Sequence, residues 1–142
     1  MKVFVDANIL VSVLNHEYPL FTYTSRILSL AGSNRFRIFT SPSCLAIAFY
    51  FAEKKYKSVS AKEKIGLLAR HLSIADNTES GVLKTVNDSR IQDFEDGLQY
   101  YSAVEKNCDC IVTEDIGDYY FSSLEVLGSR AFFEKYMNQK GK

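Results

Sequence analysis

Five aspartates stand beside short apolar or helical stretches of this sequence: Asp6, Asp93, Asp96, Asp115 and Asp118. Carboxylates that share one site repel each other, and the repulsion raises their pKa values. A hard divalent cation removes this conflict, because Mg²⁺ and Mn²⁺ both favour oxygen ligands. If the fold brings the aspartates together, their chemistry is therefore that of a Mg²⁺ or Mn²⁺ site.

Alternation of short apolar strands with helices predicts where these acids lie. Such a pattern is typical of βα units and a parallel sheet, and sites in parallel sheets gather at the carboxyl ends of the strands. Asp6 follows an apolar strand at that edge, and Asp115 and Asp118 follow another. Asp93 and Asp96 precede a helix, and the pattern alone leaves their edge of the sheet open.

The predicted fold class is α/β, with a central parallel β-sheet of four or five strands flanked by helices. Strands are predicted at 2–6, 35–40 and 110–113, with two further candidates at 72–75 and 124–127. Helices are predicted from residue 9 to 14, 20 to 31, 42 to about 57, 60 to about 71, 79 to 85, 93 to 107, and 129 to about 138. The expected N-caps are Ser41, Ser60, Asn77 or Thr78, Asp93 and Ser129.

Length, charge and residue content narrow the classes of protein to which this chain can belong. A length of 142 residues suits a single domain, residues 1–142, with a sizeable core. A formal net charge of zero argues against a strongly basic nucleic-acid module, so any RNA contact needs a local patch. We find no signal-peptide pattern, and the longest uncharged apolar run, Cys44 to Ala52, is far too short for a membrane span. Three cysteines fit a reducing compartment, so we expect a cytoplasmic protein without a membrane partner.

Three motifs resemble those of the PIN-domain nucleases, in the same order and with fitting spacing. Residues 3–10, Val-Phe-Val-Asp-Ala-Asn-Ile-Leu, resemble the opening strand and Asp-x-Asn-x-Leu of the family. Residues 93–103 resemble its third acidic motif, and residues 113–119 are similar to its last motif, Thr-x-Asp/Asn-x-x-Asp-Phe. The resemblance covers nearly the whole chain and implies a PIN-like three-layer sandwich.

The resemblance implies a metal-dependent endoribonuclease that hydrolyses RNA phosphodiester bonds. In that mechanism Asp6, Asp96 and Asp115 hold one or two Mg²⁺ or Mn²⁺ ions, with Asp93 and Asp118 supporting them. The products would carry 5′-phosphate and 3′-hydroxyl ends. Small PIN proteins are often toxins of toxin–antitoxin pairs and often dimerise, so the implied partners are RNA, an antitoxin protein and a second copy of the chain.

Asn8 and Thr113 are expected to support the acids without binding metal. The Asn8 amide would orient Asp6 or Asp115, and the Thr113 hydroxyl would hold a further hydrogen bond behind the ligands. Glu95 is expected to point away from the aspartates by helical geometry and to be solvated.

The chain departs from the family at the second acidic motif. The family usually places a Glu in the helix after the second strand, and Ile47 stands at that position here. Glu53 is the next acid, but six residues correspond to about 240° around a helix, so it faces elsewhere. A missing ligand predicts weak metal binding and slow cleavage.

The same residues also fit plainer structural roles and other functions. Asp93 and Asp96 could serve as helix caps, and Asp115 and Asp118 could be turn residues around Gly117.

The domain could also be a degenerate PIN domain that binds RNA or protein without cleaving. An aspartate-nucleophile phosphohydrolase is disfavoured, because Asn8 stands where its second Asp is needed and no Lys accompanies the motifs. The basic residues of the two helices between 42 and 71 are expected to be solvated, with a phosphate-binding patch as the alternative.

Overall fold

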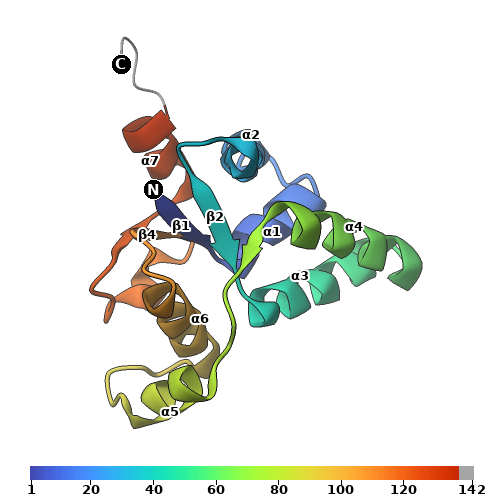
Figure 1. Ribbon diagram of the computed structural model, residues 1–142. Coiled ribbons are helices and arrows are strands. Elements are labelled where there is room, and N and C mark those ends of the chain that lie inside the picture. Colours follow the sequence, from blue (N-terminus) through green and yellow to red (C-terminus); the bar gives the residue numbers. More distant parts are fainter. Residues whose placement is uncertain (138–142) are drawn as a thin grey trace.

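Residues 1–137 are described by a computed structural model, in which five parallel strands form one sheet with helices around it (Figure 1). The strands are β1 (Lys2–Val5), β2 (Arg37–Thr40), β3 (Ser73–Ile74), β4 (Cys110–Val112) and β5 (Glu125–Leu127), in the order β3-β2-β1-β4-β5. The helices are α1 (Ala7–Leu14), α2 (Phe21–Ser29), α3 (Pro42–Lys55), α4 (Ser58–His71), α5 (Glu79–Asn87), α6 (Phe94–Glu105) and α7 (Ser129–Phe132). Short 3₁₀ turns, η1 (Leu30–Gly32) and η2 (Ile116–Tyr119), and a π-helical turn, η3 (Phe133–Met137), complete the described chain. The predicted α/β fold with a parallel sheet is confirmed.

Strand β1 forms the centre of the sheet and of the core. Val3 is in register with Ile38 of β2 on one side and with Cys110 of β4 on the other. The side chains of Val3, Phe4 and Val5 are completely buried. Strands covered on both faces read as continuous apolar runs, which is why the sequence pattern located β1 and β4 well.

The helices form two groups (Figure 1). Helix α1 packs against α2 and α3, and α4 lies along α3. Helix α5 lies along α6, which contacts β4. A glycine, Gly97, allows the close approach of α6 to the α5 side, because a Cβ atom at this position would lie 2.3 Å from the Cγ2 of Thr85.

Three of the predicted helix caps are confirmed and two are wrong. Ser41, Thr78 and Asp93 each accept a hydrogen bond from a backbone amide in the first turn of their helix. Ser60 instead lies inside α4, which begins at Ser58 after Lys57 without a side-chain cap. Residues 58–60 already belong to the first turn of the helix, so Ser60 does not define its start.

Ser129 is the first residue of α7, and Gly128 takes the cap position. The backbone amide of Ser129 donates to Glu114 Oε1 at 2.8 Å, so a carboxylate from a distant loop supplies the acceptor that a cap would provide. Helix α7 ends at Phe132 and passes into η3. The predicted end near Asn138 and the tail 140–142 lie outside the described residues.

Within residues 1–137, no helix has both the length and the apolar character that crossing a membrane requires.

Candidate active site

The topology settles which edge of the sheet carries Asp93 and Asp96. All five strands are parallel, so their carboxyl ends share one edge. Helix α6 leads into the amino end of β4, and it therefore starts at the opposite, carboxyl edge. Because Asp93 is the N-cap of α6 and Asp96 lies in its first turn, both join the edge that Asp6 and Asp115 occupy.

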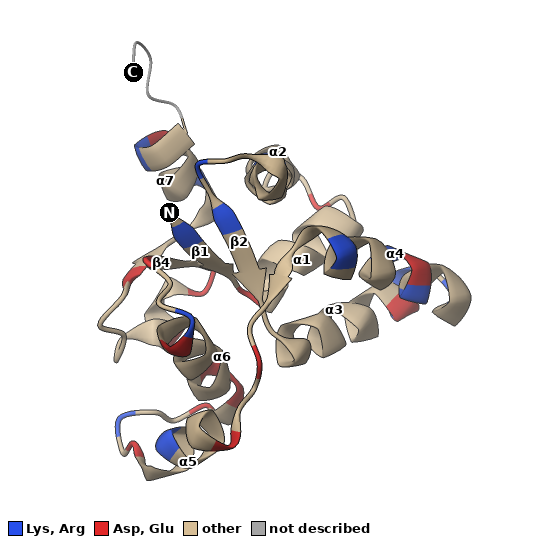
Figure 2. Cartoon of the chain, in the orientation of Figure 1, with Lys and Arg blue, Asp and Glu red and all other residues tan. Residues whose placement is uncertain are grey.

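All five predicted aspartates line one pocket of about 460 Å³ at this edge. The other lining residues are Ala7, Asn8, Val11, Glu17, Ile47, Phe51, Glu95 and Gln99. Acidic positions appear in Figure 2 on the segments around the start of α6, whereas the amino ends of β1 and β2 carry basic positions. Glu95 is solvent-exposed as expected, but it also lines the pocket, since the first turn of α6 opens onto it.

Asp6 is the most enclosed of the acids, with only 6% of its surface exposed. Its Oδ1 atom accepts from the amide of Ala7 at 2.7 Å and caps α1. Its Oδ2 atom accepts from the Thr113 hydroxyl at 2.8 Å. Burial raises the pKa of Asp6 despite these donors, and the charge of Asp115 adds to the effect. A cation in the pocket would therefore relieve an unfavourable buried charge.

Asn8 joins the end of β1 to the loop after β4, as the sequence led us to expect. Its Nδ2 atom donates to Thr113 Oγ1 at 3.0 Å and to Asp115 Oδ2 at 3.1 Å, with a longer contact of 3.5 Å to Asp6 Oδ2. Its Oδ1 atom accepts from the amide of Glu114 at 3.1 Å. Thr113 Oγ1 also accepts from the amide of Asp115. These bonds hold the carboxylates of Asp6 and Asp115 in a fixed orientation.

Asp96 carries the clearest electrostatic signature of the pocket. Partial burial, followed by the charges of Asp93, Asp6, Asp118 and Asp115, raises the pKa of Asp96 to about 7. All four neighbours named are the other predicted site acids, so their charges act together on Asp96. Near neutral pH Asp96 is therefore partly protonated, and a cation that binds its carboxylate competes with this proton.

The donor set of the pocket fits a hard divalent cation, because it consists of carboxylate and amide oxygens. Within residues 1–137, however, no three His, Cys, Asp or Glu side chains lie close enough to hold a metal ion as they stand. The aspartates line a common pocket without converging on one point. Because Asn8 and Thr113 hold Asp6 and Asp115, the other carboxylates would have to rotate toward a cation that entered.

Ile47 lines the pocket from α3. Glu53 is exposed and does not line the pocket. Glu17, in the loop after α1, does line it and is an acid that the sequence motifs did not indicate. Glu17 reaches the pocket because α1 packs against α3. The residues around position 17 show no helical or strand periodicity that would have predicted this contact.

Three buried groups behind the acids were also missed. The Tyr119 hydroxyl donates to Gln99 Oε1 at 2.5 Å, and burial raises the pKa of Tyr119 far above its usual range. The Cys44 thiol lies 4.0 Å from Asp6 Oδ1, and burial raises the pKa of Cys44 to about 12. Tyr119 and Cys44 therefore stay neutral and donate hydrogen bonds. Tyr119 is the last residue of the 113–119 motif, but only the fold aims its side chain inward.

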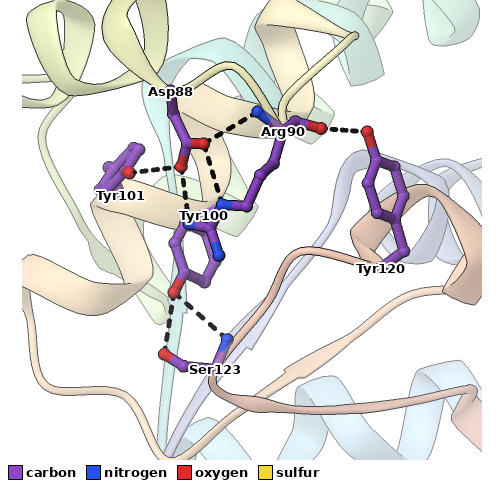
Figure 3. Close-up of polar contacts among 6 residues, drawn as sticks. All are labelled: Asp88, Arg90, Tyr100, Tyr101, Tyr120 and Ser123. Atoms are coloured by element: carbon purple, nitrogen blue, oxygen red, sulfur yellow. Dashed lines mark hydrogen bonds and ion pairs between the residues drawn. The ribbon is translucent and has the colours of Figure 1, made fainter.

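A polar cluster ties together the two segments that carry four of the acids (Figure 3). Arg90 lies in the loop before α6 and pairs with Asp88, while its carbonyl accepts from the hydroxyl of Tyr120, just after η2. Tyr101 donates to Asp88 at 3.0 Å. The Tyr100 hydroxyl and the Ser123 hydroxyl lie 2.8 Å apart and link α6 to the same segment.

A larger hollow, of about 780 Å³, lies beside this cluster between α5 and the loop before α6. Asp88 lines it, and the hydrogen bonds and charge of Arg90 hold the pKa of Asp88 well below its usual range. This carboxylate is already neutralised by an arginine. Its other acid is Glu79, and Lys84 and Arg90 line it as well, so the hollow lacks the excess of acids that distinguishes the smaller pocket.

The cysteines and histidines contribute no site of their own within residues 1–137. Cys108 and Cys110 are buried free thiols, and burial raises the pKa of each to about 12. They behave as core residues, as the sequence indicated. His16 and His71 are exposed, and neither lines the acidic pocket.

Comparison with known proteins agrees with this geometry. The sequence matches the model of the family described as PIN domain over residues 2–117. It is 28% identical over 138 residues, covering 95% of each chain, to a protein named Ribonuclease VapC1 from Aquifex aeolicus. Among solved structures, VapBC2 of Rickettsia felis bound to a promoter DNA fragment matches with a TM-score of 0.67 at 21% identity, covering 89% of this chain and 97% of that one. VapC20 of Mycobacterium tuberculosis, described as a toxin that cleaves the sarcin–ricin loop, matches with a TM-score of 0.65 at 15% identity, covering 87% and 98%. The family model spans most of the sequence and its acids line one pocket, so this chain belongs to the PIN-domain family.

Proposed function

We propose that this protein is a metal-dependent endoribonuclease of the PIN type, which hydrolyses phosphodiester bonds in RNA. The observation that carries the proposal is the pocket lined by Asp6, Asp93, Asp96, Asp115 and Asp118 at the carboxyl edge of a PIN-family sheet. Its resemblance to a named ribonuclease over nearly the full length of both chains supports the same activity.

Asp6, Asp96 and Asp115 are the proposed metal ligands, and Asp93 and Asp118 support them. A bound Mg²⁺ or Mn²⁺ would supply a water of lowered pKa and would neutralise charge on the scissile phosphate. Asp6 and Asp115 are held in place by Asn8 and Thr113, so their oxygens are oriented before the substrate arrives. Asp96, whose pKa is about 7, loses its proton when a cation competes for its oxygens.

The proposal extends to the setting in which the enzyme acts. VapBC2 is a solved complex with a DNA fragment from its promoter, and this likeness supports an antitoxin partner for our protein. We therefore propose that the protein is the toxin of a toxin–antitoxin pair and acts in the cytoplasm. Each chain would form a single PIN domain, residues 1–142, and two chains would form a homodimer. Isolation of the protein with the product of an adjacent gene would test the antitoxin partner.

A phosphohydrolase with an aspartate nucleophile accounts less well for the same acids. Its general acid would have to stand at Asn8, whose amide cannot release a proton and is already bonded to Thr113, Asp115 and Glu114. A PIN domain that binds RNA without cleaving it differs from our proposal in one measurable respect, which is strand scission.

The direct test is cleavage of single-stranded RNA by the purified protein with about 1–10 mM Mn²⁺ or Mg²⁺. This range suits a weak cation site with a dissociation constant on the order of millimolar. Asp6→Asn, Asp96→Asn and Asp115→Asn should each abolish most of the activity. Glu53→Gln is the matched control, because Glu53 is an exposed acid outside the pocket. Activity that survives all three pocket variants, or that persists in EDTA, would refute the proposal.

Metal binding can be followed without activity. A cation that binds only the folded protein raises the melting temperature, and the gain is about 2.7 kcal/mol at 100 times the dissociation constant. Wild-type protein and Glu53→Gln should show the same rise with Mn²⁺. Asp6→Ala should show little or none, and an equal rise in Asp6→Ala would place the cation elsewhere.

A further inference from the structure

The acidic pocket has a second wall, which is apolar and faces the aspartates from α1 and α3. Its members are Val11, Ile47 and Phe51. Ile47 and Phe51 are four residues apart in α3, so they lie on one face of the helix, one turn from each other. The pocket is therefore lined by oxygen donors on one side and by an aliphatic–aromatic strip on the other.

Phe51 is an unusual wall residue, because 44% of its surface is exposed although it lines a pocket. Its ring lies 5.4 Å from the ring of Tyr50, in an edge-on arrangement, and Tyr50 is 55% exposed. Burial in the core therefore does not account for these rings. Exposed aromatic faces are the surfaces on which proteins stack unpaired bases.

A cation continues the strip out of the pocket. Lys54 is seven residues after Ile47 and three after Phe51, which places it on the same face of α3. Its Nζ atom lies 4.2 Å from the centre of the Tyr50 ring and 5.6 Å from that of Phe51. The order along the face is thus aliphatic, aromatic and cationic.

We infer that the Ile47–Phe51–Lys54 face of α3 is a base-binding surface of the enzyme, on which one unpaired base beside the scissile phosphate stacks against the Phe51 ring. This inference rests on the proposed function. A nucleotide joins a charged phosphate to a flat apolar base, and the two walls of the pocket match these two parts. Lys54 supplies a positive charge for a neighbouring phosphate, which the carboxylates alone would repel.

This assignment gives the departure at position 47 a role. A glutamate there would add a ligand to the acidic wall, whereas Ile47 extends the apolar wall toward Phe51. On this inference, Ile47 contributes apolar contact with the base where a glutamate would contribute a metal ligand.

The absence of tryptophan from the sequence allows a direct test of base stacking. Phe51→Trp creates a single fluorophore on the proposed surface, and Val59→Trp creates one on an exposed position outside the pocket. Titration in Mg²⁺ with a single-stranded RNA decamer should quench Trp at position 51 and leave Trp at position 59 unchanged. The same decamer made abasic, and the decamer paired to its complement, should quench position 51 weakly or not at all.

Steady-state kinetics on the full chain provide a second readout. Phe51→Leu should raise KM for the decamer on the order of 10-fold with little change in kcat, since stacking on a protein aromatic ring contributes roughly 5- to 100-fold in affinity. Phe51→Tyr keeps an aromatic ring at this position and should therefore have the KM of the wild-type protein. Lys54→Gln should raise KM more at low salt than at high salt.

The outcomes separate this inference from the proposed function. Quenching by RNA without strand scission would support the base-binding surface and refute the nuclease. If RNA is cleaved, Trp at position 51 is not quenched and KM is unchanged in Phe51→Leu, the nuclease is supported and the base-binding surface is refuted. Equal quenching by the abasic decamer would overturn the inference. A shift of Trp emission with protein concentration, in the absence of RNA, would also overturn it, because the surface would then be a contact between copies of the chain.

Discussion

Thr113 donates its hydroxyl proton to Asp6 Oδ2 across 2.8 Å, and this bond connects the ends of two neighbouring strands of the sheet. Both side chains are buried, and the same hydroxyl oxygen accepts from Asn8 and from the amide of Asp115. This hydroxyl therefore orients the Asp6 carboxylate directly and the Asp115 carboxylate through Asn8.

Replacement of Thr113 by Val should weaken metal binding while preserving the volume of the side chain. The Asp6 carboxylate loses a donor, so its pKa rises further and protons compete better with the cation. Loss of such a supporting hydrogen bond typically costs 10- to 100-fold in metal affinity. Titration of the melting temperature with Mn²⁺ measures this loss. Thr113→Ser keeps the hydroxyl and should bind metal nearly as well as wild type; equal affinities in Val and Ser variants would contradict the role of the bond.

Stability of the metal-free protein should fall as the pH rises from about 4 to about 7. The pKa values of Asp6 and Asp96 are raised in the folded state, that of Asp96 to about 7, so the folded protein binds more protons than the unfolded chain in this window. The contrary contributions of Asp88 and Glu125, whose pKa values are lowered, are lost at more acidic pH.

Urea unfolding in EDTA at several pH values between 5 and 8 measures this slope. Asp96→Asn removes the titrating group and should flatten the slope, while Glu53→Gln should leave it as in wild type. Cation affinity should change in the opposite direction, because deprotonation frees the ligands, and should increase across the same range. A stability that rises from pH 5 to 7 in EDTA would show that the acids of the pocket do not act on one another in this way.

Ile47→Glu should return an oxygen ligand to the pocket. Ile47 is half-buried and lines the pocket, so a carboxylate at this position can reach the cation, and higher charge and ligand number increase affinity for hard cations. We expect about 10-fold tighter Mn²⁺ binding and faster cleavage at limiting Mn²⁺. Ile47→Gln is the matched neutral control and should show neither effect. A folded Ile47→Glu protein with unchanged metal binding would show that position 47 is not the family's second acidic position.

Gly97→Ala should destabilise the fold and disturb the start of α6. The added methyl would lie 2.3 Å from Thr85 Cγ2 and 2.9 Å from Ile91 Cγ2, so α5 or the loop before α6 must move. Overpacking of this kind costs about 1–3 kcal/mol, which chemical unfolding measures. Gly32→Ala has open space around its Cβ position and should change stability little. Because Asp96 precedes Gly97, we also expect weaker metal binding in the folded fraction of Gly97→Ala.

Local signals in the sequence were sufficient for the fold class and for the edge of the sheet at which Asp6 and Asp115 lie. The strands β1 and β4 are apolar runs buried on both faces, and short-range hydrogen bonds of Ser41, Thr78 and Asp93 define helix starts. Such signals act within a few residues, so they survive in the sequence pattern. The wrong caps show the limit: Ser129 gains its acceptor from Glu114, fifteen residues away, and nothing near residue 129 encodes that bond.

Only the tertiary structure decided which residues face the acids from the other side. The pattern could not place Asp93 and Asp96, because their edge depends on the return of α6 to β4 in a wholly parallel sheet. It gave no sign that Glu17, Phe51 and Glu95 line the pocket, or that Tyr119, at the end of the last motif, points inward. Their positions follow from the packing of α1, α3 and η2 around the end of β1. Contacts between elements distant in the chain arise only when the sheet assembles. A sequence pattern can predict which face of an element a residue occupies, but it does not predict which residue that face will contact.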